Sequence, residues 1–229
     1  MIGITFALRS ESSELISRLR ERRHSDNLVS GKIDNREVAI VHTGVGAKYC
    51  NERLEILLHK TRPKLVISSG FAGAVSEQLQ VGDLILAENF SDPGLIATAA
   101  RVLANRQPRR EKLFTSTLII DSIAERNEIA RAAGAAAVDM ETGAIVATCK
   151  AHGVPLLSLR AISDTARDPF PAPPSVLFDI QRQRTNWLGL ISYLLGNPIA
   201  IWRLSQFSRQ IKRVRATLTD AIVEVVRVL

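Results

Sequence analysis

The chain has 229 residues, of which 46% are hydrophobic, so it can bury one substantial core and we expect a single domain over residues 1–229. The formal net charge is +7, and all of this excess lies between Arg182 and Arg215, where seven basic residues and no acidic residue occur. The two cysteines, Cys50 and Cys149, match no metal-binding spacing, which predicts free thiols in a reducing cytoplasm and no metal site.

The first part of the chain is typical of strands alternating with helices. The N-terminal stretch Ile2–Leu8 has no basic lead-in and no cleavage site, so it predicts a strand rather than a signal peptide. The glycines of Thr43-Gly44-Val45-Gly46 predict a turn into a helix, but a lone Gly-x-Gly is weak evidence for a dinucleotide. We further expect a helix over 11–22, a hairpin from strands 28–33 and 37–42, and a buried strand over 65–69.

The middle of the chain continues the alternation. It predicts a strand over 83–89, a helix over 93–104, a basic loop through Arg109, Arg110 and Lys112, a strand over 113–120 and a helix over 124–133. Because strands alternate with helices, we expect crossover connections and a parallel or mixed sheet.

The stretch from Val138 to Ala166 contains two acidic motifs. Asp139-Met140-Glu141 follows a run of small residues and opens a predicted helix that ends at Gly153, and Ser163-Asp164 follows an apolar strand over 156–162. A helix start and a neighbouring strand end can share the edge of an α/β sheet where ligands bind. Glu141 and Asp164 can therefore face one pocket, although each can instead be a helix-capping residue.

These motifs resemble a known family. Val-Asp-Met-Glu at 138–141 and Leu-Arg-Ala-Ile-Ser-Asp-Thr-Ala at 159–166 are similar to the paired signature of the nucleoside phosphorylases, which include the methylthioadenosine and adenosylhomocysteine nucleosidases. Val66–Val75 with Val81-Gly82-Asp83 is similar to the glycine-rich strand and turn of that family. The resemblance implies an α/β fold, a three-layer αβα phosphorylase/hydrolase-like architecture with a mixed central sheet.

The resemblance also implies roles for individual residues. Asp164, positioned by Ser163, would protonate N7 of a leaving purine, while Met140 and Glu141 would hold the ribose. Glu11 falls where the nucleosidases place the acid that activates water, with an ordinary helix first-turn glutamate as the alternative. The remaining implied substrate contacts are Leu8, Gly44, Gly70, Phe71, Ala72, Gly73 and Ile120. No cofactor and no metal is implied.

The resemblance favours water over phosphate as the acceptor. Phosphorolytic members carry an arginine and a hydroxyl residue in the glycine-rich segment, where this chain has Ser68 and Phe71. Arg167 could supply an anion contact from another direction, so a phosphate-dependent purine nucleoside phosphorylase remains an alternative. Aspartate rather than asparagine at 164, together with Ile120, resembles the branch that cleaves adenine. A non-catalytic nucleoside-binding protein would be expected to lack one of the three acids, and all are present.

A short middle segment and the C-terminal region both suggest a bulky substrate. The segment over 87–113 is short, so a loop that covers the 5′ side in the small-substrate nucleosidases is missing. The last third of the chain is similar to the hopanoid-associated phosphorylases, which remove adenine from an adenosyl-lipid such as adenosylhopane. A Pro-rich linker over 168–174 leads to a helical extension over about 175–229, which we interpret as two apolar and basic helices split at 196–198.

The apolar stretch from Trp187 to Trp202 is too short and too broken to span a bilayer. We interpret the extension as an interfacial helix pair that can contact a membrane, with plain packing on the sheet or in a dimer as the alternative. Nucleic acid is possible for a basic tail, but no aromatic-interleaved patch supports it, so nucleic acid is not an expected partner. A cytoplasmic homodimer, associated with the membrane if the extension binds lipid, is the expectation.

Overall fold

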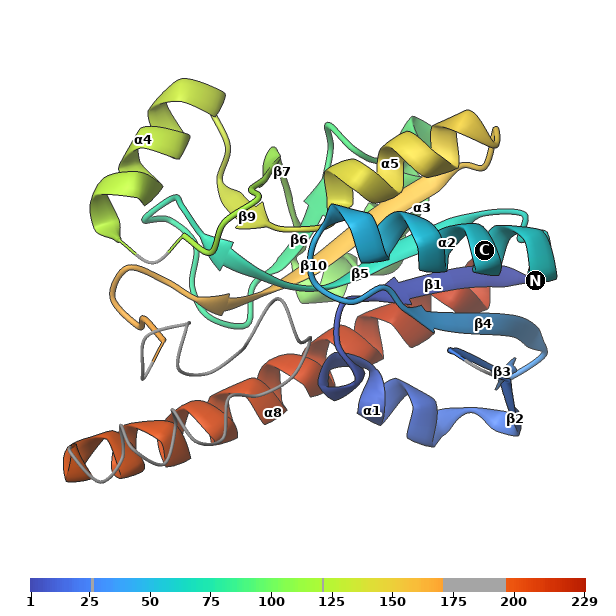
Figure 1. The fold of residues 1–229 in the computed structure, drawn as a ribbon, viewed down its shortest axis with the longest axis horizontal. Coiled ribbons are helices and arrows are strands. Elements are labelled where there is room, and N and C mark those ends of the chain that lie inside the picture. Colours follow the sequence, from blue (N-terminus) through green and yellow to red (C-terminus); the bar gives the residue numbers. More distant parts are fainter. Residues whose placement is uncertain (26, 121, 171–196) are drawn as a thin grey trace.

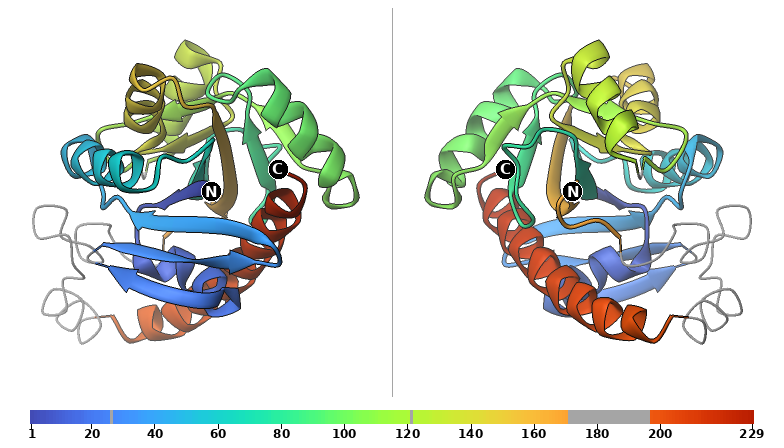
Figure 2. Two further views of the ribbon diagram at one scale, coloured as in Figure 1. Left: turned by 90° about the vertical axis from the view of Figure 1, so that its right-hand side faces the viewer. Right: turned by 90° about the vertical axis from the view of Figure 1, so that its left-hand side faces the viewer.

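The computed structural model describes residues 1–25, 27–120, 122–170 and 197–229. Figures 1 and 2 show a central sheet with helices on both faces. The strands are β1 (Ile2–Phe6), β2 (Arg20–Ser25), β3 (Leu28–Ile33), β4 (Arg36–His42), β5 (Val66–Ala74), β6 (Leu84–Ala87), β7 (Arg109–Glu111), β8 (Leu113–Thr115), β9 (Ala137–Asp139) and β10 (Leu156–Asp164). The helices are α1 (Arg9–Arg18), α2 (Ala47–Thr61), α3 (Pro93–Val102), the 3₁₀ turn η1 (Ala104–Arg106), α4 (Ile123–Ala133), α5 (Thr142–Ala151) and α8 (Pro198–Val228).

The sheet is mixed, as the sequence predicts. Its main order is β2-β3-β4-β1-β5-β10-β6-β7, and β9 pairs with β5 and with β8. Strands β4, β1, β5 and β10 run parallel, whereas β6 is antiparallel to β10 and β9 is antiparallel to β5. Because β1, β5 and β10 run in one direction, their carboxyl ends meet at one edge, where the segments that follow them come together.

The two faces of the sheet are covered by different helices. Helices α2 and α5 pack on one face through a cluster that includes Leu54, Leu57 and Ile145. Helices α1, α3 and α8 pack on the opposite face, where the larger part of the core lies. The arrangement is a three-layer αβα fold, so the predicted fold class is confirmed.

Local capping chemistry explains where several helices begin. Asp92 accepts hydrogen bonds from the backbone N–H groups of Gly94 and Leu95, and Pro93 occupies the first turn of α3. Ser122 and Glu125 form a reciprocal capping box at the start of α4. These contacts satisfy N–H groups that have no partner inside the helix.

Four predicted elements differ from the structure. The first helix ends at Arg18, because Arg20–Ser25 pairs with β3 as an exposed and strongly charged edge strand, a composition that discourages further strand pairing. The predicted basic loop contains strand β7, which pairs with β6 through Arg109 and Arg110. The predicted strand over 113–120 ends at Thr115, and the helix expected at Asp139 begins only at Thr142, after the short strand β9.

Helix α8 is a continuous helix of 31 residues. From Val214 onward its apolar side is buried against the sheet, so this part of the tail packs on the fold, which was the alternative interpretation. Toward its N-terminal end the helix projects beyond the sheet, and Ile201 and Trp202 are 57% and 62% exposed. The helix that we expect before residue 196 lies outside the described residues, as does most of the predicted Pro-rich linker.

Several ion pairs tether α8 to the body, and they include one between Arg227 and Asp34 at 2.6 Å. Arg18 contacts Asp220 at 2.6 Å, and Arg106 contacts Glu224 at 2.7 Å. Among the helices of the described ranges, none combines the length and the apolar character needed to cross a bilayer.

Candidate active site

A cavity of about 480 Å³ lies at the edge of the sheet where β1, β5 and β10 end. Ten of the residues predicted from the sequence line it, namely Leu8, Glu11, Phe71, Ala72, Gly73, Ile120, Met140, Glu141, Ser163 and Asp164. Gly44 and Gly70 are not in the lining. Three acidic groups that the sequence separates by up to 153 positions, Glu11, Glu141 and Asp164, therefore share one cavity.

At one end of the cavity, Asp164 is fully buried and held through both oxygens. The Oγ of Ser163 donates to its Oδ1 at 2.6 Å, and Nη2 of Arg126 donates to its Oδ2 at 2.5 Å. The side chains of Arg126 and Asp164 are each only 2% exposed. A charged pair so short and so far from water is held in one geometry, because separating it would leave two buried charges without partners.

Arg126 reaches this position from helix α4. It also donates to the backbone oxygens of Ala74, at 2.6 Å, and of Ile120, at 3.3 Å. The guanidinium thus joins the end of β5, the loop that carries Ile120 and the carboxyl group of Asp164. The sequence analysis missed this residue, since one arginine on a helix rich in charged residues carries no signal that it points inward.

At the opposite end of the cavity, Glu11 accepts two backbone hydrogen bonds. Its Oε2 accepts from the N–H of Leu8 at 2.8 Å and its Oε1 from the N–H of Phe71 at 3.0 Å. Burial raises the pKa of Glu11 above its ordinary value, and these two N–H groups and the charge of Arg160 partly offset the increase. Glu11 is thus tied to the ends of both β1 and β5.

Gly70 allows Glu11 and Arg160 to approach each other. Its φ is +147°, and a Cβ at this position would lie 2.8 Å from Nη1 of Arg160 and 3.0 Å from Oε1 of Glu11. The resemblance implied a substrate contact for Gly70. In the structure it lies outside the cavity lining and leaves space for two buried side chains.

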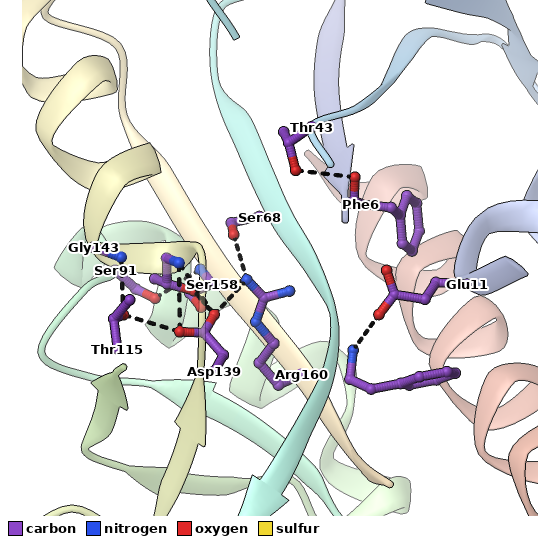
Figure 3. Close-up of polar contacts among 12 residues, drawn as sticks. Phe6, Glu11, Thr43, Ser68, Ser91, Thr115, Asp139, Gly143, Ser158 and Arg160 are labelled. Atoms are coloured by element: carbon purple, nitrogen blue, oxygen red, sulfur yellow. Dashed lines mark hydrogen bonds and ion pairs between the residues drawn. The ribbon is translucent and has the colours of Figure 1, made fainter. Parts of the chain in front are cut away.

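Beside the cavity, whose lining includes Asp139, Arg160 and Asp139 form a second buried ion pair (Figure 3). Nη2 of Arg160 lies 2.9 Å from Oδ2 of Asp139 and donates to the hydroxyls of Ser68 and Thr142 at 2.8 and 2.7 Å. Thr142 in turn donates to Asp139, and Thr115 donates to the other Asp139 oxygen at 2.9 Å. Strands β5, β8, β9 and β10 and the start of α5 meet in this network.

Glu141 also lines the cavity, and it lies at the N-terminal end of α5. Burial raises the pKa of Glu141 to about 8; the negative charge of Asp139 adds to the increase and the charge of Arg160 opposes it. At neutral pH the side chain is therefore largely a carboxylic acid, which can both donate and accept a hydrogen bond.

The two positions that correspond to the phosphate-binding residues of phosphorolytic members make contacts within the protein. Ser68 is buried and bonded to Arg160 rather than lining the cavity, and Phe71 lines it with an aromatic ring and a backbone N–H already used by Glu11. Arg167, the alternative anion contact, is exposed and absent from the lining. Among the described lining residues there is no arginine, lysine or histidine.

The mouth of the cavity is apolar, and helix α8 forms part of it. Phe207 and Ile211 of α8 line the cavity beside Phe170, and the two phenylalanine rings meet edge to face with centroids 5.6 Å apart. Leu118, also in the lining, is 68% exposed. Gln210 of α8 donates to the backbone oxygen of Ser163 at 3.1 Å, so the helix contacts the segment that carries Asp164.

Comparison with known proteins identifies a family and individual proteins that are similar to this chain. The family described as "Phosphorylase superfamily" matches residues 2–106 and 91–192. A 5'-methylthioadenosine/S-adenosylhomocysteine nucleosidase from Staphylococcus aureus is 28% identical over 198 residues, which cover 72% of this chain and 87% of that protein.

Solved structures with the same fold include a nucleosidase and a futalosine hydrolase. The Neisseria meningitidis 5'-methylthioadenosine/S-adenosylhomocysteine nucleosidase in complex with methylthio-immucillin-A has a TM-score of 0.76 at 17% identity, covering 100% of this chain and 99% of that one. The native futalosine hydrolase of Helicobacter pylori has a TM-score of 0.73 at 18% identity, covering 100% and 97%.

Proposed function

Because the chain belongs to the phosphorylase superfamily, we propose that it cleaves the N-glycosidic bond of a purine nucleoside, with adenine as the leaving base and water as the acceptor. The observation that carries this proposal is the convergence of Glu11, Glu141 and Asp164 on one cavity. The Staphylococcus aureus relative, a methylthioadenosine/adenosylhomocysteine nucleosidase by name, supports a nucleoside substrate and hydrolysis.

The three acids suit the charges that develop when this bond breaks. Positive charge grows on the sugar and negative charge on the departing base, so a proton donor at the base lowers the barrier. In our proposal Asp164 takes up a proton from solvent before the bond breaks, and it gives this proton to N7 of the departing purine. The guanidinium of Arg126, 2.5 Å away, then stabilises the carboxylate that is left, and Ser163 keeps its other oxygen oriented.

At the opposite end of the cavity, other residues would bind the sugar and the water that accepts it. Glu141 would bind the ribose hydroxyls, with Met140 packed against the sugar, and Glu11 would orient the attacking water and take its proton. Burial raises the pKa of Glu11, which makes its carboxylate a stronger base. Water is favoured over phosphate because the described lining lacks a cationic side chain that could bind a dianion.

The apolar mouth favours a bulky apolar group at the 5′ side of the substrate, and an adenosyl-lipid such as adenosylhopane fits that description. Phe170, Phe207 and Ile211 would contact this group where it leaves the cavity. We also propose that residues 1–229 act as one domain in a cytoplasmic homodimer, and that the projecting part of α8, with Trp202 and Arg203, touches the membrane that supplies the lipid.

The test is a substrate comparison with and without phosphate. Adenine release from methylthioadenosine and from a 5′-alkylthioadenosine with a long chain is followed by chromatography, and the sugar product is identified as the free 5-alkylthioribose or its 1-phosphate. We expect free sugar, no phosphate dependence, and a kcat/KM at least roughly tenfold higher for the alkyl substrate, because each buried CH₂ contributes about 0.8 kcal/mol.

Two variants of α8, one inside and one outside the cavity lining, test whether this helix sets the preference for the alkyl chain. Phe207→Ala should remove most of the preference for the alkyl chain, whereas Trp202→Ala, on the same helix but not in the cavity lining, should not alter it for a soluble substrate. A 5-alkylthioribose 1-phosphate as the product would show that the reaction is phosphorolysis. Binding of adenine without turnover of any nucleoside would indicate a sensing protein.

A further inference from the structure

A second group of functional side chains lies on the outer face of the α2–α5 layer, away from the cavity. Glu55 and His59 are one turn apart on α2, and His152 follows the last residue of α5. The sequence predicted no metal site, since these residues are up to 97 positions apart and match no ligand spacing. The packing of α2 against α5 brings them together.

The distances among their polar atoms suit a single metal ion. Nε2 of His152 lies 2.9 Å and Nε2 of His59 lies 3.3 Å from Oε2 of Glu55, and the three ligand atoms are all within 4.8 Å of one another. Zinc–ligand bonds of about 2.0–2.1 Å in a tetrahedron separate neighbouring ligand atoms by about 3.3 Å. A zinc ion therefore fits between the three groups after small rotations of the exposed His59 side chain.

The scaffold under these ligands is well defined. His152 caps α5, and its backbone N–H is bonded to the carbonyl oxygens of Thr148 and Cys149. One turn along the helix pair, the hydroxyl of Thr148 donates to Asn51 of α2 at 3.3 Å. Ligands that project from two packed helices lose little further freedom when a metal binds, which favours affinity.

Two imidazoles and one carboxylate select among metals. Imidazole suits zinc, copper and nickel, whereas magnesium and calcium prefer oxygen ligands. The side chains are partly open to solvent, so water can occupy the fourth position. We propose that Glu55, His59 and His152 bind one zinc ion, which joins the C-terminal ends of α2 and α5.

The consequence for the protein is structural. The turn before α2 contributes Val45 to the cavity, and Glu141 stands at the start of α5, so both helices lead away from the proposed active site toward the metal. An ion that binds only the folded chain raises its stability by mass action. It is too far along the helices to touch a substrate, so it should leave kcat nearly unchanged.

The test uses tag-free, metal-free protein titrated with zinc chloride in a calorimeter, with magnesium chloride as the comparison. We expect one zinc per chain, no heat from magnesium, and a higher midpoint of thermal unfolding with zinc. His59→Gln, His152→Gln and Glu55→Gln should each weaken zinc binding at least roughly tenfold and abolish the thermal shift, since each removes one of three ligands.

His24→Gln is the control, because His24 is exposed on β2 and belongs to no ligand cluster in the described part of the chain. All four positions are at the surface, so the metal-free variants should unfold at the wild-type temperature, which is checked first. The proposal is overturned if the wild type takes up no zinc in the titration, or if His24→Gln weakens binding as much as the cluster variants do. Unchanged binding in His59→Gln and His152→Gln would equally overturn it.

Discussion

The two ends of the cavity hold buried carboxyl groups in opposite electrostatic surroundings. Asp164 is in direct contact with a cation, with Arg126 at 2.5 Å. At the other end, Glu11 accepts two backbone hydrogen bonds and Glu141 is close to the negative charges of Asp139 and Glu11, and burial raises the pKa of both glutamates. The nearest cation to them, Arg160, is engaged by Asp139. The same type of side chain is thus prepared for different chemistry by what lies behind it.

Replacing Asp164, the acid that is paired with Arg126, should have the largest effect on catalysis. Asp164→Asn keeps the shape and should fold, but it removes the proton donor, and general acid catalysis is typically worth about a hundred- to ten-thousand-fold. We expect kcat for adenine release to fall within that range, with circular dichroism unchanged. A variant that retains more than about half of the wild-type turnover would show that Asp164 is not the donor.

The next change tests Glu11, at the end of the cavity away from the Arg126–Asp164 ion pair. Glu11→Gln should lower kcat for hydrolysis roughly a hundredfold, since an amide cannot accept a proton from water. It should leave adenine binding, measured by calorimetry, within about threefold, because Glu11 lies at the far end of the cavity from Asp164. Normal hydrolysis by this variant would show that Glu11 has only a structural role, as the acceptor of hydrogen bonds from the backbone N–H groups of Leu8 and Phe71.

Arg126 permits a direct test of the pairing. Arg126→Met keeps much of the volume but leaves Asp164 buried without its cation, which should cost about 3–5 kcal/mol of unfolding free energy. The double variant Arg126→Met with Asp164→Asn should be more stable than Arg126→Met alone, because no unpaired charge remains. Denaturant unfolding of the four proteins gives the coupling energy. Additive losses would mean that the two side chains do not stabilise each other.

The smallest effect concerns stability and pH. The pKa of Glu141 is raised from 4.5 to about 8, so the folded chain holds this proton more tightly than the unfolded chain. Its contribution is complete below about pH 4.5 and is lost as the pH rises toward 8. Wild-type unfolding temperature should therefore fall over this range, and the fall should be several degrees smaller for Glu141→Gln, which carries no titrating proton.

Glu11 remains in that variant and titrates in the same direction, so a reduced slope rather than a flat line is expected. The Asp164→Asn protein serves as the comparison. Identical slopes for the wild type and Glu141→Gln would show that Glu141 is ionised in the folded chain at neutral pH.

Local patterns predicted much of the fold. Apolar runs and glycine or proline boundaries gave β1, the β3–β4 hairpin, α2, α3, α4 and β10 with small errors in their ends. The errors occurred in segments whose secondary structure depends on tertiary contacts. Arg20–Ser25 has the charge of a helix end but pairs with β3, and Arg109–Glu111 has the composition of a loop but pairs with β6.

The candidate site was predictable only in part, and for a physical reason. Glu11, Glu141 and Asp164 lie in motifs next to strand and helix ends, where short-range patterns are informative. Arg126 was missed because its importance arises from the register of α4 over the sheet, which no local pattern specifies. Arg160 lies in a motif that resembles the family signature, but its polar partners Ser68, Asp139 and Thr142 come from three other segments.

Helix α8 has a consequence for how the protein is made. Its buried residues, among them Leu218, Ile222 and Val225, cover the apolar face of strands that the ribosome has produced much earlier. Until α8 leaves the exit tunnel, that face stays open to water and to other nascent chains, which is a condition that favours aggregation. The contacts also join residues far apart in the sequence, such as Arg18 and Asp220, which are 202 positions apart, and such non-local contacts slow folding. We therefore expect folding to be completed mainly after translation of α8, and incomplete chains to depend on chaperones.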